Sequence, residues 1–311
     1  MKIVYVNELQ SFEELKSGIA ATIGFFDGVH IGHRFIIKQL NEIAQKANIP
    51  SAVITFHTHP RKVLQTDYVP ELLTSFEEKL YQLSTTGIDY CIVIDFTKKL
   101  SEYSASSFIK EILVKQFYVK YLLIGYDHQF GKDRTDDFDA YKESGKSVGM
   151  EVVLANQLEE QKFHYSSTVV RKMLQNGQVK DAAQILQHNH RLKGVVIGGN
   201  KQGRELGFPT ANLDLFDKGK IIPKEGVYAV RIEIENRIYN GMMYVGSRPT
   251  LFNQGELRLE ANVFDFSGNL YGKTIVVEFV SYLREDMKFE QVKNLVEQLE
   301  KDKKAALEIL T

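Results

Sequence analysis

The segment from residue 20 to 47 constrains the fold most, because a strand, a glycine-containing turn and an amphipathic helix follow one another directly. AATIGFF (20–26) is apolar and contains β-branched residues, as buried strands do. Gly28 and Gly32 follow it, and the next apolar residues recur at helical spacing on one face: Ile36, Leu40, Ile43, Ala44 and Ala47. This order predicts a βα unit, from which parallel sheets with crossover helices are built.

The rest of the first half repeats this alternation of strands and helices. Strands are predicted in four runs: SAVITF (51–56), CIVIDF (91–96), KYLLIGY (120–126) and MEVVLA (150–155). Between them, Ser75 and Glu78 form a capping box that opens the helix SFEEKLYQL. Parallel sheets of this kind are typical of nucleotide-binding domains, so a Rossmann-like α/β domain is expected.

From about residue 190 the pattern changes to β-rich runs separated by turns. Side chains in 227–235 alternate with period two, and SGN (267–269) predicts a turn between the last two runs. These runs predict an antiparallel barrel or closed sheet. The chain then ends in a predicted helix whose apolar stripe would pack on the barrel: Phe289, Val292, Leu295, Val296 and Leu299.

Two domains are expected, because a chain of 311 residues exceeds what one core usually holds, about 250 to 300 residues. The pattern changes between Asp181 and Lys193, and we place the boundary at 185/186. The predicted fold is therefore α/β plus β, with a Rossmann-like domain over 1–185 and a barrel domain with a C-terminal helix over 186–311.

Composition limits the partners and the compartment. The formal net charge is −1, so neither nucleic acid nor an anionic membrane is an expected partner. Cys91 is the single cysteine, which excludes an internal disulfide and favours a reducing compartment. No apolar run approaches the roughly 20 residues that span a bilayer, and the N-terminus lacks the layout of a signal peptide. A cytoplasmic protein is expected, and a homo-oligomer stays open.

The turn after the first strand is suited to binding an anion. Backbone N–H groups in a glycine turn and at a helix N-terminus attract phosphate, and glycines let it approach closely. The order strand, Asp-Gly, His-x-Gly-His and helix favours this interpretation over histidines that are merely satisfied within a loop. The sequence predicts a nucleotide site formed by Gly24, Phe26, Asp27, Gly28, His30, Gly32 and His33.

Two further blocks are candidates for the same site. Gly125 and Asp127 directly follow a predicted strand, at the carboxyl edge where such sheets bind ligands. Ser167 and Thr168 open a predicted helix, and Arg171 follows one turn later, which favours a second phosphate clamp. A simple helix cap is the open alternative for the hydroxyl group of Ser166, just before them.

Two other patterns are weaker. Gly145-Lys146-Ser147 and the stretch 125–132 resemble parts of a P-loop, but their glycines do not have its spacing. His57 and His59 lack cysteine or acidic neighbours at ligand spacing, so a loop at a strand end is favoured over a metal site.

A second glycine-rich loop precedes a strand in the C-terminal half. Thr210 and Asn212 place neutral oxygens two residues apart on one strand face, which suits Mg²⁺ shared with nucleotide phosphates. A barrel loop made of turn residues is the alternative. The glycines before them can wrap phosphates, so nucleotide-binding residues are predicted at Gly199, Gly203, Arg204, Gly207 and Pro209.

The block from 24 to 33 resembles that of the HxGH nucleotidyltransferase superfamily. Members transfer a nucleotidyl group by in-line attack on the α-phosphorus of a nucleoside triphosphate, and their histidines steady the triphosphate. The resemblance implies catalytic roles for His30 and His33, with Arg171 as the clamp. Positioning and electrostatic stabilisation would then support the reaction without a covalent intermediate.

The motif GRELGFPTAN (203–212) is similar to that of riboflavin kinases. Over nearly the whole chain, the sequence resembles the bacterial bifunctional riboflavin kinase/FMN adenylyltransferase family, the prokaryotic FAD synthetases. The resemblance rests on GFFDGVHIGH, GYDHQFGK, SSTVVR, GRELGFPTAN, EGVYAV, VGSRPT, LYGK and LREDMKF.

This resemblance implies FAD biosynthesis in two ATP-dependent steps: riboflavin gives FMN, and FMN gives FAD with release of pyrophosphate. It implies a six-stranded antiparallel barrel in which Glu260 is the general base toward the flavin ribityl 5′-hydroxyl, beside the Mg²⁺-bound triphosphate. Flavin contacts are implied for Phe56, Arg284 and Phe289.

The chain departs from the family pattern at several positions. His57 stands where proline is usual, and Asn262 replaces a histidine two residues beyond the proposed base. A usual Leu-Gly-Arg-Pro is replaced at 186–190. Two alternatives stay open: an FMN adenylyltransferase whose barrel does not phosphorylate, and a flavin or nucleotide sensor without turnover.

Overall fold

The computed structural model describes residues 1–6, 15–65, 67, 69, 71–125, 130–132, 138–157, 165–198, 203, 206–250 and 253–311. The chain folds into two compact units, one holding 1–70 and 75–166 and the other holding 71–74 and 167–311. It therefore passes from one unit to the other at 70/71, 74/75 and 166/167. A single domain boundary at 185/186 stays a prediction.

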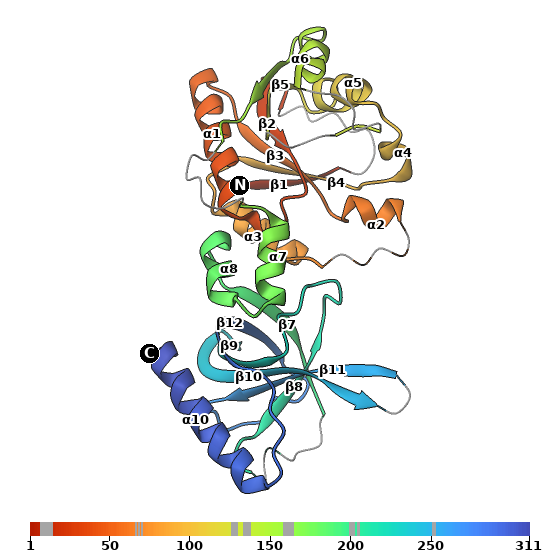
Figure 1. Ribbon diagram of the computed structural model, residues 1–311. Helices are drawn as coiled ribbons and strands as arrows, with labels where there is room; N and C mark the ends of the chain where they lie inside the picture. The colour runs from red at the N-terminus through yellow and green to blue at the C-terminus, as the bar shows by residue number, and fades with distance from the viewer. Residues whose placement is uncertain are drawn as a thin grey trace. The chain divides into compact units, whose positions relative to one another are not determined.

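The first unit is built on a six-stranded parallel sheet (Figure 1). Its strands are β1 (Lys2–Val6), β2 (Ile19–Ile23), β3 (Ser51–Phe56), β4 (Tyr90–Ile94), β5 (Val119–Ile124) and β6 (Glu151–Leu154). They lie in the order β1-β4-β3-β2-β5-β6, and the neighbours pair in parallel. Because the direction of winding reverses at β2, a topological switch point lies between β2 and β5, where open α/β sheets bind ligands.

Helices cover both faces of this sheet. α1 (Ile31–Ala47) and α3 (Phe76–Ser84) pack on one face, over Val53 and Cys91 among others. The other face is covered by α5 (Ala105–Phe108), the π-helical segment η3 (Ile109–Val114) and α6 (Phe138–Lys146). The short helices α2 (Pro60–Leu64) and α4 (Lys98–Ser101) follow β3 and β4. Burial on both faces explains why β2 and β3 are continuous apolar runs.

The predicted elements of this unit agree with the structure except at strand ends. The capping box is present, since Ser75 Oγ accepts from the Glu78 N–H at 3.2 Å and the Glu78 carboxylate accepts from the Ser75 N–H at 2.9 Å. β4 ends at Ile94 and β5 at Ile124, two residues before the predicted ends. The prediction omits β1, an edge strand whose Lys2, Ile3 and Tyr5 are exposed and whose apolar signal is therefore weak.

The second unit contains a closed six-stranded antiparallel barrel, which confirms the predicted barrel. Its strands are β7 (His190–Ile197), β8 (Thr210–Leu215), β9 (Gly226–Ile234), β10 (Arg237–Thr250), β11 (Asn253–Val263) and β12 (Thr274–Arg284). The order is β10-β11-β8-β7-β12-β9, and pairing of β9 with β10 closes the barrel. This closure leaves no unpaired edge strand in the barrel.

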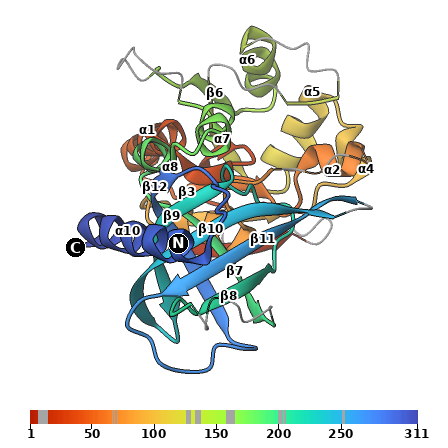
Figure 2. The same ribbon diagram turned by 60° about the horizontal axis from the view of Figure 1, so that its bottom comes forward.

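The C-terminal helix α10 (Val292–Leu310) lies along the outside of the barrel (Figure 2). The predicted apolar stripe is wrong at its start, because Phe289 precedes the helix and Val292 is 63% exposed. The packing face is shifted toward the C-terminus, where Ala306 and Leu310 are buried beside Ala229 and Met242. This cover explains why β9 is buried on both sides in its first half.

Two helices and one short segment also belong to the barrel unit. The helices are α7 (Ser167–Gln175) and α8 (Val179–Leu186), and the segment is 71–74. The Leu72 N–H donates to the Gly219 carbonyl at 2.8 Å, and the Ile221 N–H donates to the Leu72 carbonyl at 2.9 Å. Leu73 and Thr74 are buried there. Residues 71–74 are thus an integral part of the barrel unit.

Candidate functional site

The turn between β2 and α1 has an unusual backbone. Phe26 and Val29 have φ angles of 55° and 41°, a region that bulky and β-branched residues avoid, and Gly28 has a φ of 80°. Such conformations cost on the order of 1–3 kcal/mol each and cluster at functional sites. The short helix η2 (Asp27–Val29) is buried, so packing holds the turn in this shape.

His30 and His33 stand together at the N-terminus of α1. His30 is the N-cap residue and is buried, and its ring stacks on that of His33 with centroids 3.7 Å apart. A Cβ on Gly32 would come within 3.2 Å of both the His30 ring and the Tyr165 carbonyl oxygen, so a larger residue would displace one of them. The pair lies where the helix dipole favours an anion. The structure brings these residues together with Gly24, Asp27 and Gly28 on one turn.

Phe26 contributes to the core. Its side chain is 5% exposed, contacts the His33 ring edge-on at 5.1 Å between centroids, and packs with Val29 and Val53. Any contact of Phe26 with a nucleotide would therefore be made by its backbone.

The loop after β5 lies at the same edge of the sheet as this turn. Gly125 follows β5, which pairs with β2, so Gly125 and Gly24 both stand at the carboxyl ends of neighbouring strands. Asp127 lies outside the described residues. Further along, the Tyr141 hydroxyl accepts from the Phe130 N–H at 3.0 Å and donates to the Phe130 carbonyl at 2.9 Å, which fixes the end of the loop.

The third predicted block begins α7 and belongs to the barrel unit. Ser167 and Thr168 are in its first turn. Arg171 Nε donates to the Glu71 carbonyl at 2.6 Å, and Gln175 Nε2 donates to the Glu71 carboxylate at 2.9 Å. The structure thus places Arg171 against residues 71–74, and its role as a phosphate clamp stays a prediction.

The structure shows a buried lysine beside the turn whose role the sequence did not indicate. Lys79 on α3 is 2% exposed and donates to the Phe25 carbonyl at 3.2 Å. The available signal was its position in SFEEKLYQL, three residues after Phe76 and four before Leu83, on the apolar face of the helix.

In the barrel, oxygen-bearing side chains meet on two neighbouring strands. Thr210 and Asn212 lie on β8, and Glu260 on β11 is directly opposite Asn212. The Thr210 hydroxyl donates to Glu260 Oε2 over 3.4 Å, and Arg258 Nη1 lies 3.4 Å from Glu260 Oε1. Opposite residues, and residues two apart on a strand, share a face. The structure therefore brings the predicted cation ligands and the predicted base together.

Two neighbours of Glu260 complete this face. Asn262, which departs from the family pattern, is opposite Thr210 and donates to the Pro209 carbonyl at 2.7 Å, so it anchors the start of β8. Tyr244 on β10 is opposite Glu260 on the other side. Burial, aided by the Asp286 carboxylate, raises the pKa of Tyr244 to about 12. The sequence did not point to Tyr244.

Gly203 lies close to Phe208, just before β8. The Phe208 N–H donates to the Gly203 carbonyl at 2.8 Å, and a Cβ on Gly203 would lie 2.3 Å from the Phe208 carbonyl oxygen. Gly207 has a φ of 82°, which a residue with a side chain rarely adopts. Gly199 and Arg204 lie outside the described residues.

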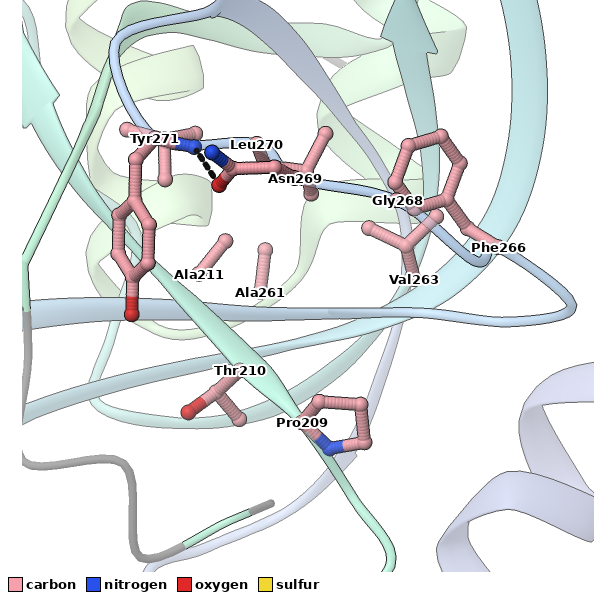
Figure 3. A pocket seen from close by; sticks show the side chains of 11 residues that line it. Pro209, Thr210, Ala211, Ala261, Val263, Phe266, Gly268, Asn269, Leu270 and Tyr271 are labelled. Atoms are coloured by element: carbon pink, nitrogen blue, oxygen red, sulfur yellow. Dashed lines mark hydrogen bonds between the residues drawn. The ribbon is translucent and has the colours of Figure 1, made fainter.

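A pocket opens beside Thr210 (Figure 3). Tyr271 and Phe266 stand at its two ends, with Ala211 and Ala261 between them. Asn269 Oδ1 accepts from the Tyr271 N–H at 3.1 Å, which shapes the loop that forms one wall. Aromatic and small apolar walls suit a flat heterocycle. The sequence did not indicate this pocket, although LYGK (270–273) is one of the blocks that carry the family resemblance.

The three predicted flavin contacts have different surroundings. Arg284 donates to the Asp302 carboxylate from Nε at 2.9 Å and Nη2 at 2.7 Å, and from Nη1 to the Glu285 carbonyl at 2.9 Å. Phe289 is half-buried just before α10, and the Phe56 ring contacts Phe96 edge-on at 5.4 Å. The structure gives Arg284 an anchoring role, and its flavin contact stays a prediction, as do those of the two phenylalanines.

Replacement of Asp302 by alanine is expected to lower the free energy of unfolding by about 3 kcal/mol, because the largely buried Arg284 would lose its partner. The Arg284 and Asp302 side chains are 17% and 4% exposed. Urea unfolding followed by circular dichroism measures this effect. The double variant Arg284→Met/Asp302→Leu should recover most of the loss, and a loss below about 1 kcal/mol in Asp302→Ala would contradict the anchoring role.

The histidines considered as metal ligands have other contacts. His59 Nδ1 accepts from the Arg61 N–H at 3.1 Å and caps α2, and the His57 ring contacts Phe76 with centroids 4.5 Å apart. Within the described ranges, no cluster of three or more histidine, cysteine or acidic side chains is arranged to hold a metal. Thr210 and Asn212 offer the hard oxygen donors that Mg²⁺ accepts when phosphates supply the remaining ligands.

Two family models match the chain in succession. The model described as FAD synthetase matches residues 12–169, and the one described as riboflavin kinase matches 186–310. The bifunctional riboflavin kinase/FMN adenylyltransferase of Bacillus subtilis (strain 168) is 36% identical, over 98% of this chain and 96% of that protein. The protein of the same name from Haemophilus influenzae is 37% identical, over 97% of each. The chain belongs to the bifunctional riboflavin kinase/FMN adenylyltransferase family.

A solved structure also has this fold. It is 30% identical with a TM-score of 0.86, covers 98% of this chain and 99% of its own, and is described as a macrolide-efflux protein from Streptococcus pneumoniae. The family models that match this chain describe flavin-modifying enzymes instead. In the described part of the chain, no helix has both the length and the apolar character required to cross a bilayer.

Membership of the bifunctional riboflavin kinase/FMN adenylyltransferase family confirms the resemblance seen in the sequence. The departures at 186–190 are accommodated in the barrel. Asn189 Nδ2 donates to Glu278 Oε1 at 2.8 Å, and His190 Nε2 lies 2.9 Å from the Ile221 carbonyl oxygen. Burial holds the pKa of His190 well below its usual value, so it stays a neutral core residue. The roles of individual site residues stay predictions.

Proposed function

We propose that this chain makes FAD from riboflavin in two ATP-dependent steps, both within one polypeptide. The barrel phosphorylates riboflavin to FMN, and the α/β unit adenylylates FMN to FAD and releases pyrophosphate. The observation that supports this most is the match of both family models, one after the other, to a single chain.

In the adenylyl step, a phosphate oxygen of FMN attacks the α-phosphorus of ATP and pyrophosphate leaves. His30 and His33 donate hydrogen bonds to the triphosphate at the N-terminus of α1, where the helix dipole also favours negative charge. Gly28 and Gly32 let the phosphates approach the backbone. Catalysis then depends on holding FMN and ATP in line, and no covalent intermediate with the protein is needed.

In the kinase step, Glu260 accepts the proton of the riboflavin 5′-hydroxyl as that oxygen attacks the γ-phosphorus of ATP. Thr210 and Asn212 would hold Mg²⁺, which when bound neutralises charge on the phosphates. The pocket between Tyr271 and Phe266 is suited to the adenine ring of ATP, next to the loop that would wrap its phosphates.

An intact kinase half is favoured over a degenerate one. Two of the residues that depart from the family pattern are bonded within the barrel: Asn189 donates to Glu278, and Asn262 holds Pro209 next to the proposed cation ligands. A sensor without turnover would have no need of a carboxylate beside those ligands, or of paired histidines at the turn formed by residues 24–33, which we call the phosphate turn. These features support an enzyme with both activities.

The test is a flavin product assay with each substrate alone. Riboflavin, ATP and Mg²⁺ should give FMN and then FAD on chromatography, and FMN with ATP and Mg²⁺ should give FAD. Chelation of Mg²⁺ should stop FMN formation. FAD from FMN without any FMN from riboflavin would favour the monofunctional alternative, and tight flavin binding without product would favour the sensor.

We also propose a cytoplasmic location. It is supported by the single cysteine, Cys91, which is buried and has no second cysteine in the chain to form a disulfide with, as is usual for proteins of a reducing compartment. A homo-oligomer stays an open prediction, which sedimentation velocity would test.

A further inference from the structure

Lys79 is a buried cation whose hydrogen-bond donors are all directed at the ends of two strands. Its Nζ donates to the Phe56 carbonyl at 2.8 Å, the Phe25 carbonyl at 3.2 Å and the Thr55 hydroxyl at 3.3 Å. An ammonium group has three donors, so these contacts use its full capacity. Thr55 Oγ1 in turn donates to the Phe25 carbonyl at 3.2 Å. Lys79 therefore ties the end of β3 to the turn that follows β2.

Aromatic faces complete the surroundings of this cation. Nζ lies 4.1 Å from the centroid of the Phe25 ring and 5.3 Å from that of the Phe76 ring. Such contacts favour a cation more strongly when it is shielded from water. Asp27, itself 4% exposed, is the acidic group whose charge acts on Lys79. The positive charge thus lies directly beside the backbone of the phosphate turn.

A lysine in this position is costly to the fold. Burial of a charge opposes folding unless the charge is paired and hydrogen-bonded, and an apolar side chain of similar volume is often as stabilising or more so. Leu83 on the same helix is such a residue, fully buried in the core that contains Phe26 and Val29. The contacts of Lys79 with the turn therefore point to a role beyond packing.

We propose that Lys79 is a positioning residue for adenylyl transfer. Its ammonium group holds the Phe25 carbonyl and so keeps Gly24 to His30 in the shape that presents backbone N–H groups and His30 to the triphosphate. It also places a positive charge behind the turn. This charge would stabilise the negative charge that develops on the bound phosphates in the transition state. This inference rests on the adenylyl transfer proposed above.

Lys79→Met is the informative variant, because methionine keeps most of the stem and removes the charge and the donors. We expect the kcat of FAD formation from FMN to fall about 10- to 100-fold, the range for a misplaced reactant. The KM for FMN should change by less than about threefold. The variant loses contacts that act in the transition state, and it keeps those that bind FMN equally well before the reaction. FMN formation from riboflavin, measured on the same molecules, should stay near the wild-type rate.

Leu83→Ala is the matched control. It empties a core position on the same helix, one turn further on, in the cluster that also holds Phe26 and Val29, and it leaves the hydrogen bond from Lys79 to the Phe25 carbonyl in place. It should lower the unfolding temperature but leave the rate of FAD formation close to wild type. An equal loss of FAD formation in Leu83→Ala would show that Lys79 acts only by holding α3 in place, and would overturn the proposal.

A pH profile supplies a readout that a structural role would not move. Burial lowers the pKa of Lys79 to about 8, opposed by Asp27 on η2. Cys91 on β4 stays a neutral thiol, since its pKa is raised to about 11. Two histidines contact the rings around Lys79: His57 after β3 contacts Phe76, and His59 contacts Phe25. FAD formation by the wild type should therefore decline above about pH 8, and this decline should be absent in Lys79→Met.

The contribution of Lys79 to the stability of the fold should depend on pH in the opposite direction to activity. Its folded pKa lies below its unfolded value near 10.4, so the unfolded state binds more protons between these values and the contribution to stability rises with pH. If Lys79 had only a structural role, no loss of activity would therefore be expected between about pH 8 and 10.4.

The proposal is overturned if Lys79→Met keeps the wild-type kcat, or if it retains the decline above pH 8. If Lys79→Met does not fold, the wild-type profile decides, since the kinase step of the same protein must lack that decline. A wild-type protein that makes no FAD from FMN at any pH would refute the adenylyl transfer itself, and the inference with it.

Discussion

Replacement of both His30 and His33 by alanine is expected to abolish FAD formation from FMN and to spare FMN formation from riboflavin. The two rings are stacked at the N-terminus of α1, with centroids 3.7 Å apart, so both can reach one triphosphate. Loss of one well-placed electrostatic donor costs about 100- to 1000-fold in kcat. Because the two histidines act on the same group, their effects are not additive, and we expect at least a 1000-fold loss for the pair, roughly the larger single effect.

Steady-state rates with FMN and with riboflavin as separate substrates measure this outcome. Lys38→Ala, on the exposed side of the same helix, is the matched control and should leave both rates unchanged. The single variants show which ring contributes more. Equal loss of both activities in a double variant that still folds would contradict two separate sites.

Glu260→Gln is expected to have the opposite effect on the two activities: FMN formation is lost and FAD formation is kept. Glutamine keeps the shape of the side chain and can still bond to Thr210, but it cannot accept the proton of the riboflavin hydroxyl. General-base catalysis contributes about 100- to 10,000-fold, so FMN formation should fall by a factor in that range. FAD formation from supplied FMN should be unaffected, because the histidines and the phosphate turn belong to the other compact unit.

Glu278→Gln controls for the loss of a carboxylate elsewhere in the barrel. Glu278 on β12 binds Arg191 and Asn189, so this variant tests a structural contact and should affect stability more than rate. If Glu260→Gln phosphorylates riboflavin within about tenfold of the wild type, another group must accept the proton. Asp286, close enough to bias the titration of Tyr244, would then be the next residue to test.

The fold of this chain was predictable wherever a local pattern is strong. β2 and β3 of the parallel sheet are buried on both faces and therefore appear as continuous apolar runs, and the capping box at Ser75 lies within four residues. β1 lacked such a signal because its alternate side chains are exposed at the sheet edge. The phosphate turn was predictable for the same reason, since Gly24 to His33 form one contiguous segment.

Features that depend on distant pairs were not predictable. Arg284 is recognisable in the sequence, but its partner Asp302 is on the next element, and only the packing of α10 on β12 brings the two together. In the sequence, Lys79 is one of several charged residues in its helix. Only the fold brings it into contact with the ends of β2 and β3. The pocket at Tyr271 likewise arises from three separated segments of the barrel.

The segment 71–74 bears on how such a chain can be recombined. Although it is encoded within the first half, it is hydrogen-bonded to 219–221 and to Arg171, which belong to the barrel unit. Consider a chimera that joins the first half of one relative to the second half of another. Its segment 71–74 would then come from a different protein than the residues to which that segment is hydrogen-bonded. Exchange of the kinase half would therefore require transplanting residues 71–74, which are encoded in the first half of the gene, along with it.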